Sequence, residues 1–317
     1  MSLTELHFVT EPSRFSNYII HHDPVRGGKL AIGSYPFVTE DRREAHTDKL
    51  LDLGVNVWVS LVESSETQAF GDYREYVLER SPTSEFLDCP IPDRSVCRDS
   101  VLFELVETVY RLVREGKFVF VHCFGGHGRS GTFAACFLMR YYGYSAEVAI
   151  DRNRLMHLAR EHHPRKPTPQ GTRQYAQIKR YRPPISVIVS GDRDSANSFR
   201  SVMTRALKDL PPGSTVVHGA CKGIDTIAGE IAEELGLHTK EYPVTQDLWK
   251  KFGRAAGPIR NRKMLEENPK FVLAFHPDIT HSKGTKDMMM AAYLEGVPVW
   301  LYDLKDKKRF EGDVERM

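Results

Sequence analysis

Residues 118–132 read FVFVHCFGGHGRSGT, and this stretch decides the fold of the first half of the chain. Its apolar, β-forming start (118–121) indicates a short buried strand. The glycines that follow predict a tight turn whose backbone N–H groups can converge on one point. From Arg129 onwards the sequence suits a helix, and its positive N-terminal end would face that same point. Strand, turn and helix in this order predict an α/β unit with an anion site at the turn.

The side chains of this stretch point to nucleophilic attack on a phosphate group. Cys123 follows the strand directly, and a nest of N–H groups favours the thiolate that acts as nucleophile. Arg129 supplies a bidentate fork that suits the oxygens of a phosphoryl group in transfer. Ser130 can donate to the thiolate as it departs, and His122 would hold the loop by hydrogen bonds. The residues expected to bind the phosphate are Phe124, Gly125, Gly126, His127, Gly128 and Arg129.

This chemistry also needs a general acid for the leaving oxygen, carried by a separate loop. The segment CPIPDRS, residues 89–95, lies upstream, and its prolines would fix a carboxylate on a short loop. Asp93 is the first candidate, Asp99 the second and Asp88 the third. The alternative is that Asp93 only caps a turn.

An amide side chain near the site could orient the attacking water. Gln170 and Gln174 lie in the segment TPQGTRQ (168–174) and are equivalent candidates. Alternatively, this segment only starts a helix, with Thr168 as its cap and Pro169 at the first helical position.

The motifs HCFGGHGRSGT (122–132), PIPDRS (90–95) and LAIGSYP (30–36) resemble the dual-specificity branch of the protein tyrosine phosphatase superfamily. The resemblance covers about residues 15–180. It implies a dual-specificity-phosphatase fold, a phosphocysteine intermediate and catalysis without a metal or other cofactor. It leaves the substrate open, because this branch includes phosphatases of proteins, of RNA 5′ ends and of phosphoinositides. No segment matches the deep-pocket loop of tyrosine-specific members.

Length and pattern divide the chain into two α/β domains. At 317 residues it is about twice as long as a typical domain. The first half alternates between strand-like and helix-like runs, at 29–32, 40–53, 55–62, 100–115 and 117–122. This alternation predicts a mainly parallel sheet. The pattern is interrupted by RPP at 182–184 and then starts again, so we expect a phosphatase domain at 1–182 and a second domain at 183–317.

Charge and cysteine usage exclude several classes of protein. Lys+Arg 44 against Asp+Glu 42 leave a formal net charge of +2, which in bulk favours no polyanion. The basic stretch from Arg152 to Arg182 is either a solvated helix face or a rim that attracts anions. Five cysteines without a C-x-x-C pair argue against a disulfide framework and for a reducing compartment. Without a signal core or a membrane-length apolar run, we expect a cytoplasmic protein that does not bind membranes.

The second half repeats the pattern of strand, glycine turn and helix. Strands are expected at 185–190, 215–217 and 271–275, which predicts a Rossmann-like, doubly wound sheet. Turns at the carboxyl ends of such strands bind ligands, and phosphates favour the helix N-termini that follow. Arg260 and Arg262 would add cations to these turns, although surface salt bridges would also explain them. The candidate ligand-binding residues are Gly191, Arg193, Gly219, Lys222, Gly223, Asp225, Arg260, Asn261, Arg262, Ser282, Lys283, Gly284 and Thr285.

Several motifs of this half resemble the YspA/YpsA-related branch of the SLOG superfamily, over about residues 185–303. They are GDRD (191–194), TVVHGACKGIDTIAGEIAEELGL (215–237), FGRAAGPIRNRKML (252–265), VLAFHP (272–277) and SKGTKDM (282–288). The resemblance implies a Rossmann-like fold that binds nucleotides or nucleotide-derived ligands. Relatives include DNA-processing protein A and the cytokinin-activating phosphoribohydrolases. Where the hydrolases carry a glutamate this chain has Met288, so we expect ligand binding rather than glycosidic hydrolysis.

Two features of the second half could be mistaken for catalytic sites. Cys221 lacks an arginine six residues on, so we interpret it as a small residue in a tight turn. His276 and His281 lack the further ligands of a metal set, and we expect no metal.

Three functions fit this sequence. The first is a thiol phosphatase whose second domain binds a nucleotide-derived ligand, with a substrate such as a phosphorylated ADP-ribose or an NADP-like molecule. The second is a nucleotide sensor whose phosphatase domain acts on a phosphoprotein. The third is a nucleic-acid-end phosphatase, which the absence of interleaved aromatic residues in the basic stretch disfavours.

Overall fold

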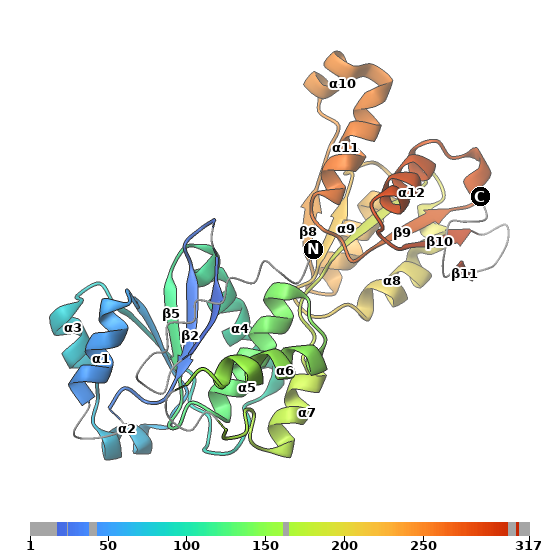
Figure 1. Ribbon diagram of the computed structural model, residues 1–317. Coiled ribbons are helices and arrows are strands. Elements are labelled where there is room, and N and C mark those ends of the chain that lie inside the picture. The colour runs from blue at the N-terminus through green and yellow to red at the C-terminus, as the bar shows by residue number, and fades with distance from the viewer. Residues whose placement is uncertain (1–17, 24, 38–42, 161–164, 304–308, 311–317) are drawn as a thin grey trace. The chain divides into compact units, whose positions relative to one another are not determined.

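The computed structural model describes residues 18–23, 25–37, 43–160, 165–303 and 309–310. The chain forms two compact units, Met1–Pro183 and Pro184–Met317 (Figure 1), and their division lies one residue beyond the boundary expected from the sequence. Both units are mixed α/β, each with a sheet of its own. No helix in the described part of the chain is both long and apolar enough to cross a bilayer.

The first unit contains a five-stranded sheet in the order β1-β2-β5-β3-β4. Its strands are β1 (Tyr18–His22), β2 (Lys29–Gly33), β3 (Val57–Ser60), β4 (Glu85–Asp88) and β5 (Phe118–His122). The β1–β2 pair is antiparallel and the other pairs are parallel, as the alternating pattern predicted. β2, β3 and β5 fall in the predicted strand-like runs, whereas β1 and β4 were not predicted.

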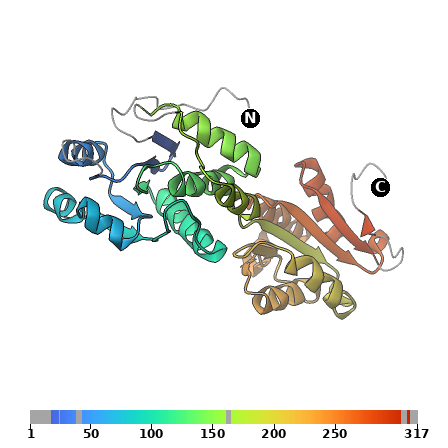
Figure 2. The same ribbon diagram turned by 90° about the horizontal axis from the view of Figure 1, so that it is seen from below.

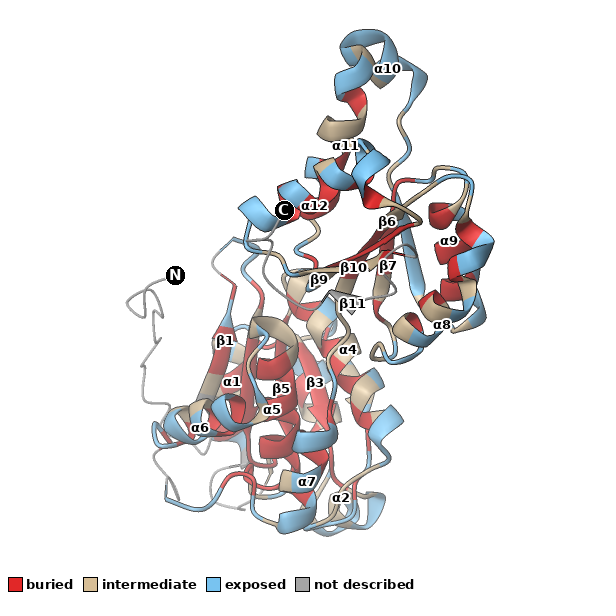
Figure 3. Cartoon of the chain, turned by 90° about the vertical axis from the view of Figure 1, so that its right-hand side faces the viewer, coloured by how far each residue is buried: buried red, intermediate tan, exposed pale blue. Residues whose placement is uncertain are grey.

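Helices cover both faces of this sheet because successive strand residues point to opposite sides. Trp58 faces a core formed with α1 and α3, while its neighbours Val57 and Val59 face a core formed with α4 and α5. Figure 3 shows β3 and β5 buried between these layers. The helices of the unit are α1 (Arg43–Asp52), α2 (Ser64–Phe70), α3 (Arg74–Arg80), α4 (Asp99–Arg114), α5 (Arg129–Tyr142), α6 (Ala146–His157) and α7 (Thr172–Arg180).

The second unit contains a six-stranded sheet in the order β11-β10-β9-β6-β7-β8, and all pairs but β10–β11 are parallel. Three of its strands were predicted: β6 (Ser186–Gly191), β7 (Thr215–His218) and β9 (Phe271–His276). The others are β8 (His238–Glu241), β10 (Val299–Asp303) and β11 (Arg309–Phe310). β8 was missed because its sequence, HTKE, is polar and exposed at the edge of the sheet.

Helices flank the second sheet on both faces as well (Figures 1 and 2). Val187 and Val189 face α8 and α9, whereas Ile188 between them faces α11 and α12. The helices are α8 (Arg200–Lys208), α9 (Ile224–Glu234), α10 (Gln246–Phe252), α11 (Ala256–Leu265) and α12 (Gly284–Leu294), with short 3-10 turns at Ala196–Phe199, Gly253–Ala255 and Ile279–His281. The carboxyl ends of β6, β7 and β9 therefore meet at one edge of a three-layered unit.

Candidate active site

Cys123 lies where the buried central strand β5 ends, in the turn that leads to α5. Its side chain is 2% exposed, and its Sγ lies 3.3 Å from the Oγ of Ser130. The preceding His122 is fully buried, and its Nε2 forms a 2.7 Å hydrogen bond with the hydroxyl of Tyr73. Burial lowers the pKa of His122 to about 3, so its imidazole is neutral at physiological pH. The contacts fit the supporting role expected for His122.

The carbonyl groups of the loop all point outward. From residue 124 to residue 128, each carbonyl oxygen accepts a hydrogen bond of 2.8–3.0 Å from a group outside it. In loop order, the donors are the backbone N–H of Tyr35, both ends of the Arg160 guanidinium, the hydroxyl of Thr168, and the N–H and hydroxyl of Thr132. In a trans peptide the N–H points away from the carbonyl, so the N–H groups of 125–129 turn to the opposite side. This is the geometry that an anion-binding nest needs.

Two glycines make this close packing of the loop sterically feasible. Gly126 has φ +70°, and a Cβ there would lie 2.5 Å from the carbonyl carbon of Gly33 at the end of β2. A Cβ on Gly131 would lie 2.1 Å from the Oγ1 of Thr168. Larger residues would push the loop away from the groups that orient it.

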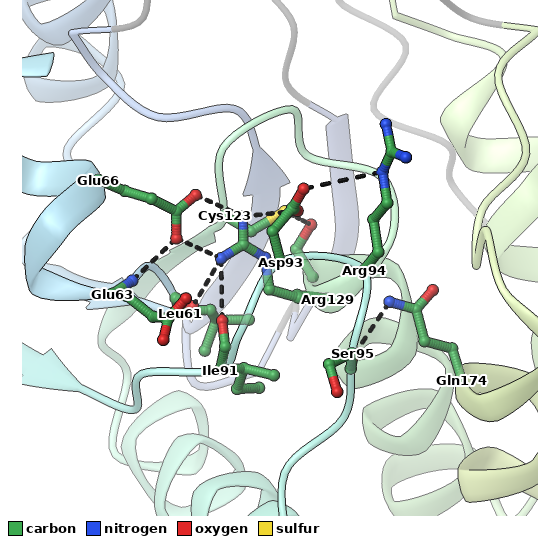
Figure 4. Close-up of polar contacts among 11 residues, drawn as sticks. Leu61, Glu63, Glu66, Ile91, Asp93, Arg94, Ser95, Cys123, Arg129 and Gln174 are labelled. Carbon is green, nitrogen blue, oxygen red and sulfur yellow. Dashed lines mark hydrogen bonds and ion pairs between the residues drawn. The ribbon is translucent and has the colours of Figure 1, made fainter. Parts of the chain in front are cut away.

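The guanidinium of Arg129 is held by two carboxylates (Figure 4). Its Nη1 and Nη2 form a bidentate pair with the carboxylate of Glu66, at 2.6 and 2.8 Å. Nη2 also lies 3.1 Å from Oδ1 of Asp93, and Nη1 donates to the carbonyl of Ile91 at 3.0 Å. The Arg129 side chain is 1% exposed, so its fork direction is fixed by these contacts.

Glu66, which lies on α2 after β3, was not predicted from the sequence. Burial opposes its ionisation, but the hydrogen bonds from Arg129 outweigh this and keep the pKa of Glu66 below its usual value. A signal was present: the segment ESSE (63–66) follows a parallel strand next to β5, and the carboxyl ends of such strands share one edge.

Of the three candidate acids, the structure brings only Asp93 to Arg129. The turn Pro92–Ser95, closed by a 3.0 Å backbone hydrogen bond, presents the Asp93 carboxylate, which is 59% exposed. Asp99 instead receives two hydrogen bonds from Arg180, at 2.9 and 3.1 Å, and so joins α4 to α7. Asp88 forms an ion pair with Arg74.

The two candidate glutamines differ in their surroundings. Gln174 is fully buried; its Oε1 accepts the N–H groups of Gln170 and Gly171, and its Nε2 donates to the carbonyl of Ser95. The Nε2 end of this amide therefore holds the loop that carries Asp93 against α7, while its Oε1 end caps the N-terminus of α7. Gln170 is exposed. A Cβ at Gly128 would lie 2.9 Å from its Oε1 and 2.9 Å from the Nε2 of Gln174, so both amides lie beside the phosphate loop.

The alternative that Thr168 caps the helix is wrong. α7 begins only at Thr172 with Gly171 as its cap, and the Thr168 hydroxyl donates to the loop carbonyl of His127 instead. The hydroxyl therefore orients the phosphate loop and does not cap a helix.

An aromatic pair flanks the loop. Phe124, directly after Cys123, is 39% exposed and stacks on Phe70 with ring centroids 4.7 Å apart and an interplanar angle of 21°. Phe70 is the last residue of α2, so this helix brings both Glu66 and Phe70 to the site. An apolar shelf next to a phosphate cradle suits a leaving group with an apolar or planar face.

The second unit holds a pocket of about 620 Å³ at the carboxyl edge of its sheet. Five of the predicted ligand-binding residues line it: Arg193, Asn261, Arg260, Lys283 and Gly284. The segment after β8 provides much of the remaining wall, with Thr245, Gln246, Trp249, Lys250 and Arg254. These residues were missed because β8 itself was not predicted.

The charge of this pocket is strongly positive. Among the described lining residues, Asp287 is the one carboxylate, and the cations are Arg193, Lys250, Arg254, Arg260 and Lys283. Trp249 adds an aromatic surface that is 56% exposed. Cations around an exposed indole can bind an anionic ligand that carries a planar ring.

The other predicted residues of the second unit support the turns rather than line the pocket. A Cβ on Gly219 would overlap the guanidinium of Arg260, and Gly223, with φ +94°, packs against the backbone of Arg193. Gly191 likewise approaches the carbonyl of Phe275.

The predicted polar residues outside the pocket have partners within the unit. Lys222 is exposed and pairs with Asp194, and Arg262 pairs with Asp287. The Oγ of Ser282 accepts the N–H of Thr285 at the start of α12.

Two further positions discussed above, Asp225 and Met288, are buried. Asp225 is buried, which raises its pKa, and it accepts the N–H of Cys221. Met288 is fully buried in the core. Groups of three or more residues that could hold a metal were not found among the described residues.

Residues 25–180 match the family described as Swiss Army Knife protein, DSP-PTPase phosphatase domain. This unit is a DSP-type phosphatase domain. The protein is accordingly a phosphoric monoester hydrolase, as the loop chemistry predicted.

Two curated proteins and one solved structure illustrate what the chain is similar to. Gene 61 protein of Mycobacterium phage D29 is 33% identical over 119 residues, which are 36% of this chain and 92% of that protein, and the chain belongs to one family with it. Phosphatidylglycerophosphate phosphatase PTPMT1 of Arabidopsis thaliana is 27% identical over 122 residues, which are 38% of this chain but only 33% of that relative. The crystal structure of Tk-PTP in the active form is 27% identical, covers 52% of this chain and 94% of its own, and has a TM-score of 0.41.

Proposed function

We propose that the DSP-type phosphatase domain hydrolyses phosphomonoesters with Cys123 as nucleophile. The observation that carries this proposal is the outward orientation of every carbonyl from 124 to 128, which turns the N–H groups of the loop toward an anion. In the first step the Cys123 thiolate attacks phosphorus, the bond to the leaving oxygen breaks, and Asp93 gives that oxygen a proton. The product is a phosphocysteine and a free alcohol.

In the second step a water molecule attacks the phosphocysteine. Asp93, now a carboxylate, accepts a proton from the water, and the sulfur leaves as a thiolate. The hydroxyl of Ser130, 3.3 Å from Sγ, donates a hydrogen bond to the departing sulfur. Both candidate glutamines lie beside Gly128, and Gln170 is the better choice for orienting the water, because the Gln174 amide already binds the Ser95 carbonyl and the N–H groups of Gln170 and Gly171.

Arg129 stabilises the phosphoryl group in transfer by exchanging one partner. Its pair with Glu66 fixes the guanidinium plane, while its contact with the exposed Asp93 is the one that an incoming phosphate oxygen replaces. The released Asp93 is then free to serve the leaving oxygen. This exchange couples binding of the dianion to placement of the acid.

For the substrate, we propose a phosphorylated nucleotide metabolite, such as phospho-ADP-ribose or an NADP-like molecule. Two observations support this: the resemblance of the second unit to SLOG proteins, and its cationic pocket with the exposed Trp249. The cations suit phosphates, and the indole suits a base. The second unit is proposed to bind the ligand without a metal and without hydrolysing it.

Two alternatives predict different substrates. A nucleotide-sensing regulator would act on a phosphoprotein, and a nucleic-acid-end phosphatase would show a steep loss of affinity with salt. A lipid phosphomonoester is a further arm of the test, because one relative is a phosphatidylglycerophosphate phosphatase.

The deciding experiment compares kcat/KM of the full chain for phosphorylated nucleotides, phosphopeptides, 5′-phosphorylated RNA and phosphatidylglycerophosphate. The proposal expects the nucleotides to be the best substrates, and expects Arg260→Ala to lower their kcat/KM. Arg205→Ala, which removes an exposed cation of α8, is the matched control. If phosphopeptides or the lipid exceed the nucleotides by orders of magnitude, the metabolite proposal fails while the phosphatase chemistry stands.

A further inference from the structure

Arg160 lies just after α6 and was expected only as part of a basic stretch, yet it is 3% exposed. Its Nη1 donates to the carbonyl of Gly126 at 2.8 Å, and its Nη2 donates to the carbonyl of Gly125 at 3.0 Å. A buried guanidinium is costly unless its donors are satisfied. Here the phosphate loop itself satisfies two of them, so the charge is buried where it can act on the site.

The two carbonyls belong to the peptide groups whose N–H ends are those of Gly126 and His127. Because these peptides are trans, fixing the carbonyls toward Arg160 turns both N–H groups the other way. A guanidinium is planar and rigid, so it fixes two neighbouring peptide planes at once. Tyr35, Thr168 and Thr132, the other donors to the loop carbonyls, are neutral and each binds a single carbonyl.

The charge of Arg160 acts in the same direction as its geometry. A cation at the carbonyl end of a peptide group stabilises the orientation in which the positive N–H end faces the other side. The nearby anion is also attracted through a thin layer of backbone, where little water screens the interaction. Nη1 further lies 2.9 Å from His127 Nδ1 and 2.9 Å from His157 Nε2, and both imidazoles are buried.

We propose that Arg160 is a positioning residue of the phosphate loop, which orients the N–H groups of Gly126 and His127 by binding the loop from its carbonyl side. The proposal deepens the phosphatase function proposed above and rests on it. Substrate does not touch Arg160. Its effect reaches the phosphate through the two peptide groups, in contrast to Arg129, which binds the phosphate itself.

A direct test measures phosphate binding in the full chain. Inorganic phosphate and vanadate are titrated calorimetrically into Cys123→Ser, alone and combined with Arg160→Met or Arg160→Lys. We expect Arg160→Met to weaken binding by about tenfold to a hundredfold, the usual effect of losing hydrogen bonds to a charged group. Arg160→Lys should recover part of this loss, because it keeps the charge but not the two-pronged geometry.

The matched control is Arg154→Met, on the helix α6 that precedes Arg160. Arg154 is exposed, binds the hydroxyl of Tyr175 and the carboxylate of Asp151, and does not touch the loop. The Arg154→Met variant should bind phosphate with the same affinity as its parent protein. Kinetics with p-nitrophenyl phosphate should show a higher KM and a lower kcat in Arg160→Met at temperatures well below its Tm. A purely structural role would lower Tm and leave both constants unchanged.

A further measurement uses the protein that keeps Arg160, so it does not depend on whether an Arg160 variant folds. In the Cys123→Ser protein labelled with ¹⁵N, phosphate should shift the backbone amide signals of Gly126 and His127. The proposal is overturned if these amides do not respond to bound phosphate, or if a folded Arg160→Met binds phosphate within twofold of its parent. Failure of the proposed phosphatase mechanism is a separate outcome, which would appear as full activity in the Cys123→Ser protein.

Discussion

The phosphate loop of the first unit and the pocket of the second unit occupy equivalent places but are built differently. Both lie where parallel strands end in glycine-containing turns that lead to helices. In the loop, five successive carbonyls are tied to the scaffold, and Cys123 and Arg129 are almost inaccessible. In the pocket, the wall consists largely of side chains such as Trp249, Lys250 and Arg254, which follow the exposed edge strand β8.

The difference follows from what each region has to do. Phosphoryl transfer needs donors that are already in place when charge develops, and a backbone fixed from behind provides them without reorganisation. A ligand pocket gains selectivity from exposed cations and an aromatic ring, which can adapt to what they bind. We therefore expect substitutions in the loop to have large effects on turnover, and substitutions in the pocket to have smaller effects on affinity.

The largest effect is expected for Cys123→Ser. Removing the nucleophile should lower kcat by on the order of a thousandfold or more, as in other enzymes with a covalent intermediate. Because the backbone cradle does not depend on the thiol, vanadate binding should persist. Steady-state kinetics and a vanadate titration measure the two properties. Turnover at the parent rate would contradict the whole account of the first unit.

Asp93→Asn should cost about a hundredfold with a poor leaving group, since an amide cannot protonate the leaving oxygen. The loss should be smaller with p-nitrophenyl phosphate, whose leaving group departs without a proton. Asp99→Asn, at the second candidate, should leave this dependence on the leaving group as it is, because Asp99 binds Arg180. Rates over a series of aryl and alkyl phosphates decide between them. The opposite pattern would make Asp99 the acid.

Glu66→Gln should lower kcat/KM by about tenfold, because the bidentate pair that fixes the Arg129 plane loses its charge. It should also lower stability in a pH-dependent way. The pKa of Glu66 is depressed in the folded chain, so its contribution is present above its usual value of 4.5 and is lost as pH falls below that. Urea unfolding at several pH values should show the two proteins converging in acid. An equal difference at all pH values would contradict this reading of the pair.

The smallest effect is expected in the second unit. Arg260→Ala should weaken the binding of ADP-ribose by about tenfold, the usual loss for one charged contact. Arg205→Ala, on the far side of the sheet from α11, should bind like the parent. Calorimetry on the full chain measures both. If the two variants lose affinity equally, the pocket is not where the ligand binds, and the difference drawn between the two regions weakens.

The sequence predicted those parts of the site that lie in short motifs, including Asp93 in the segment PIPDRS. Cys123, Arg129 and Ser130 are specified by local spacing, and the buried strand before them by its apolar residues. Groups from elements that carry no such motif could not be predicted in this way. Glu66 comes from a short helix with no buried residue, and Arg160 looked like any surface cation of a basic stretch.

The same limit explains the second unit. The glycine turns helped to predict β6, β7 and β9, and five of the predicted residues line the pocket. Trp249 and Arg254 were not predicted as pocket residues. The strand before them, β8, is polar and exposed and lacks the apolar pattern by which strands are predicted. Edge strands of this kind become visible only through the pairing they make with a neighbour, here β7.

Whether Cys123 carries the phosphoryl group is decided by trapping the intermediate. The full chain is mixed with p-nitrophenyl phosphate, quenched in acid during the first turnovers, digested and analysed by mass spectrometry. We predict that the peptide containing Cys123 gains the mass of one phosphoryl group, and that the peptide containing Cys221 does not. Turnover with no phosphoryl group on Cys123, or with the group on another residue, would contradict it.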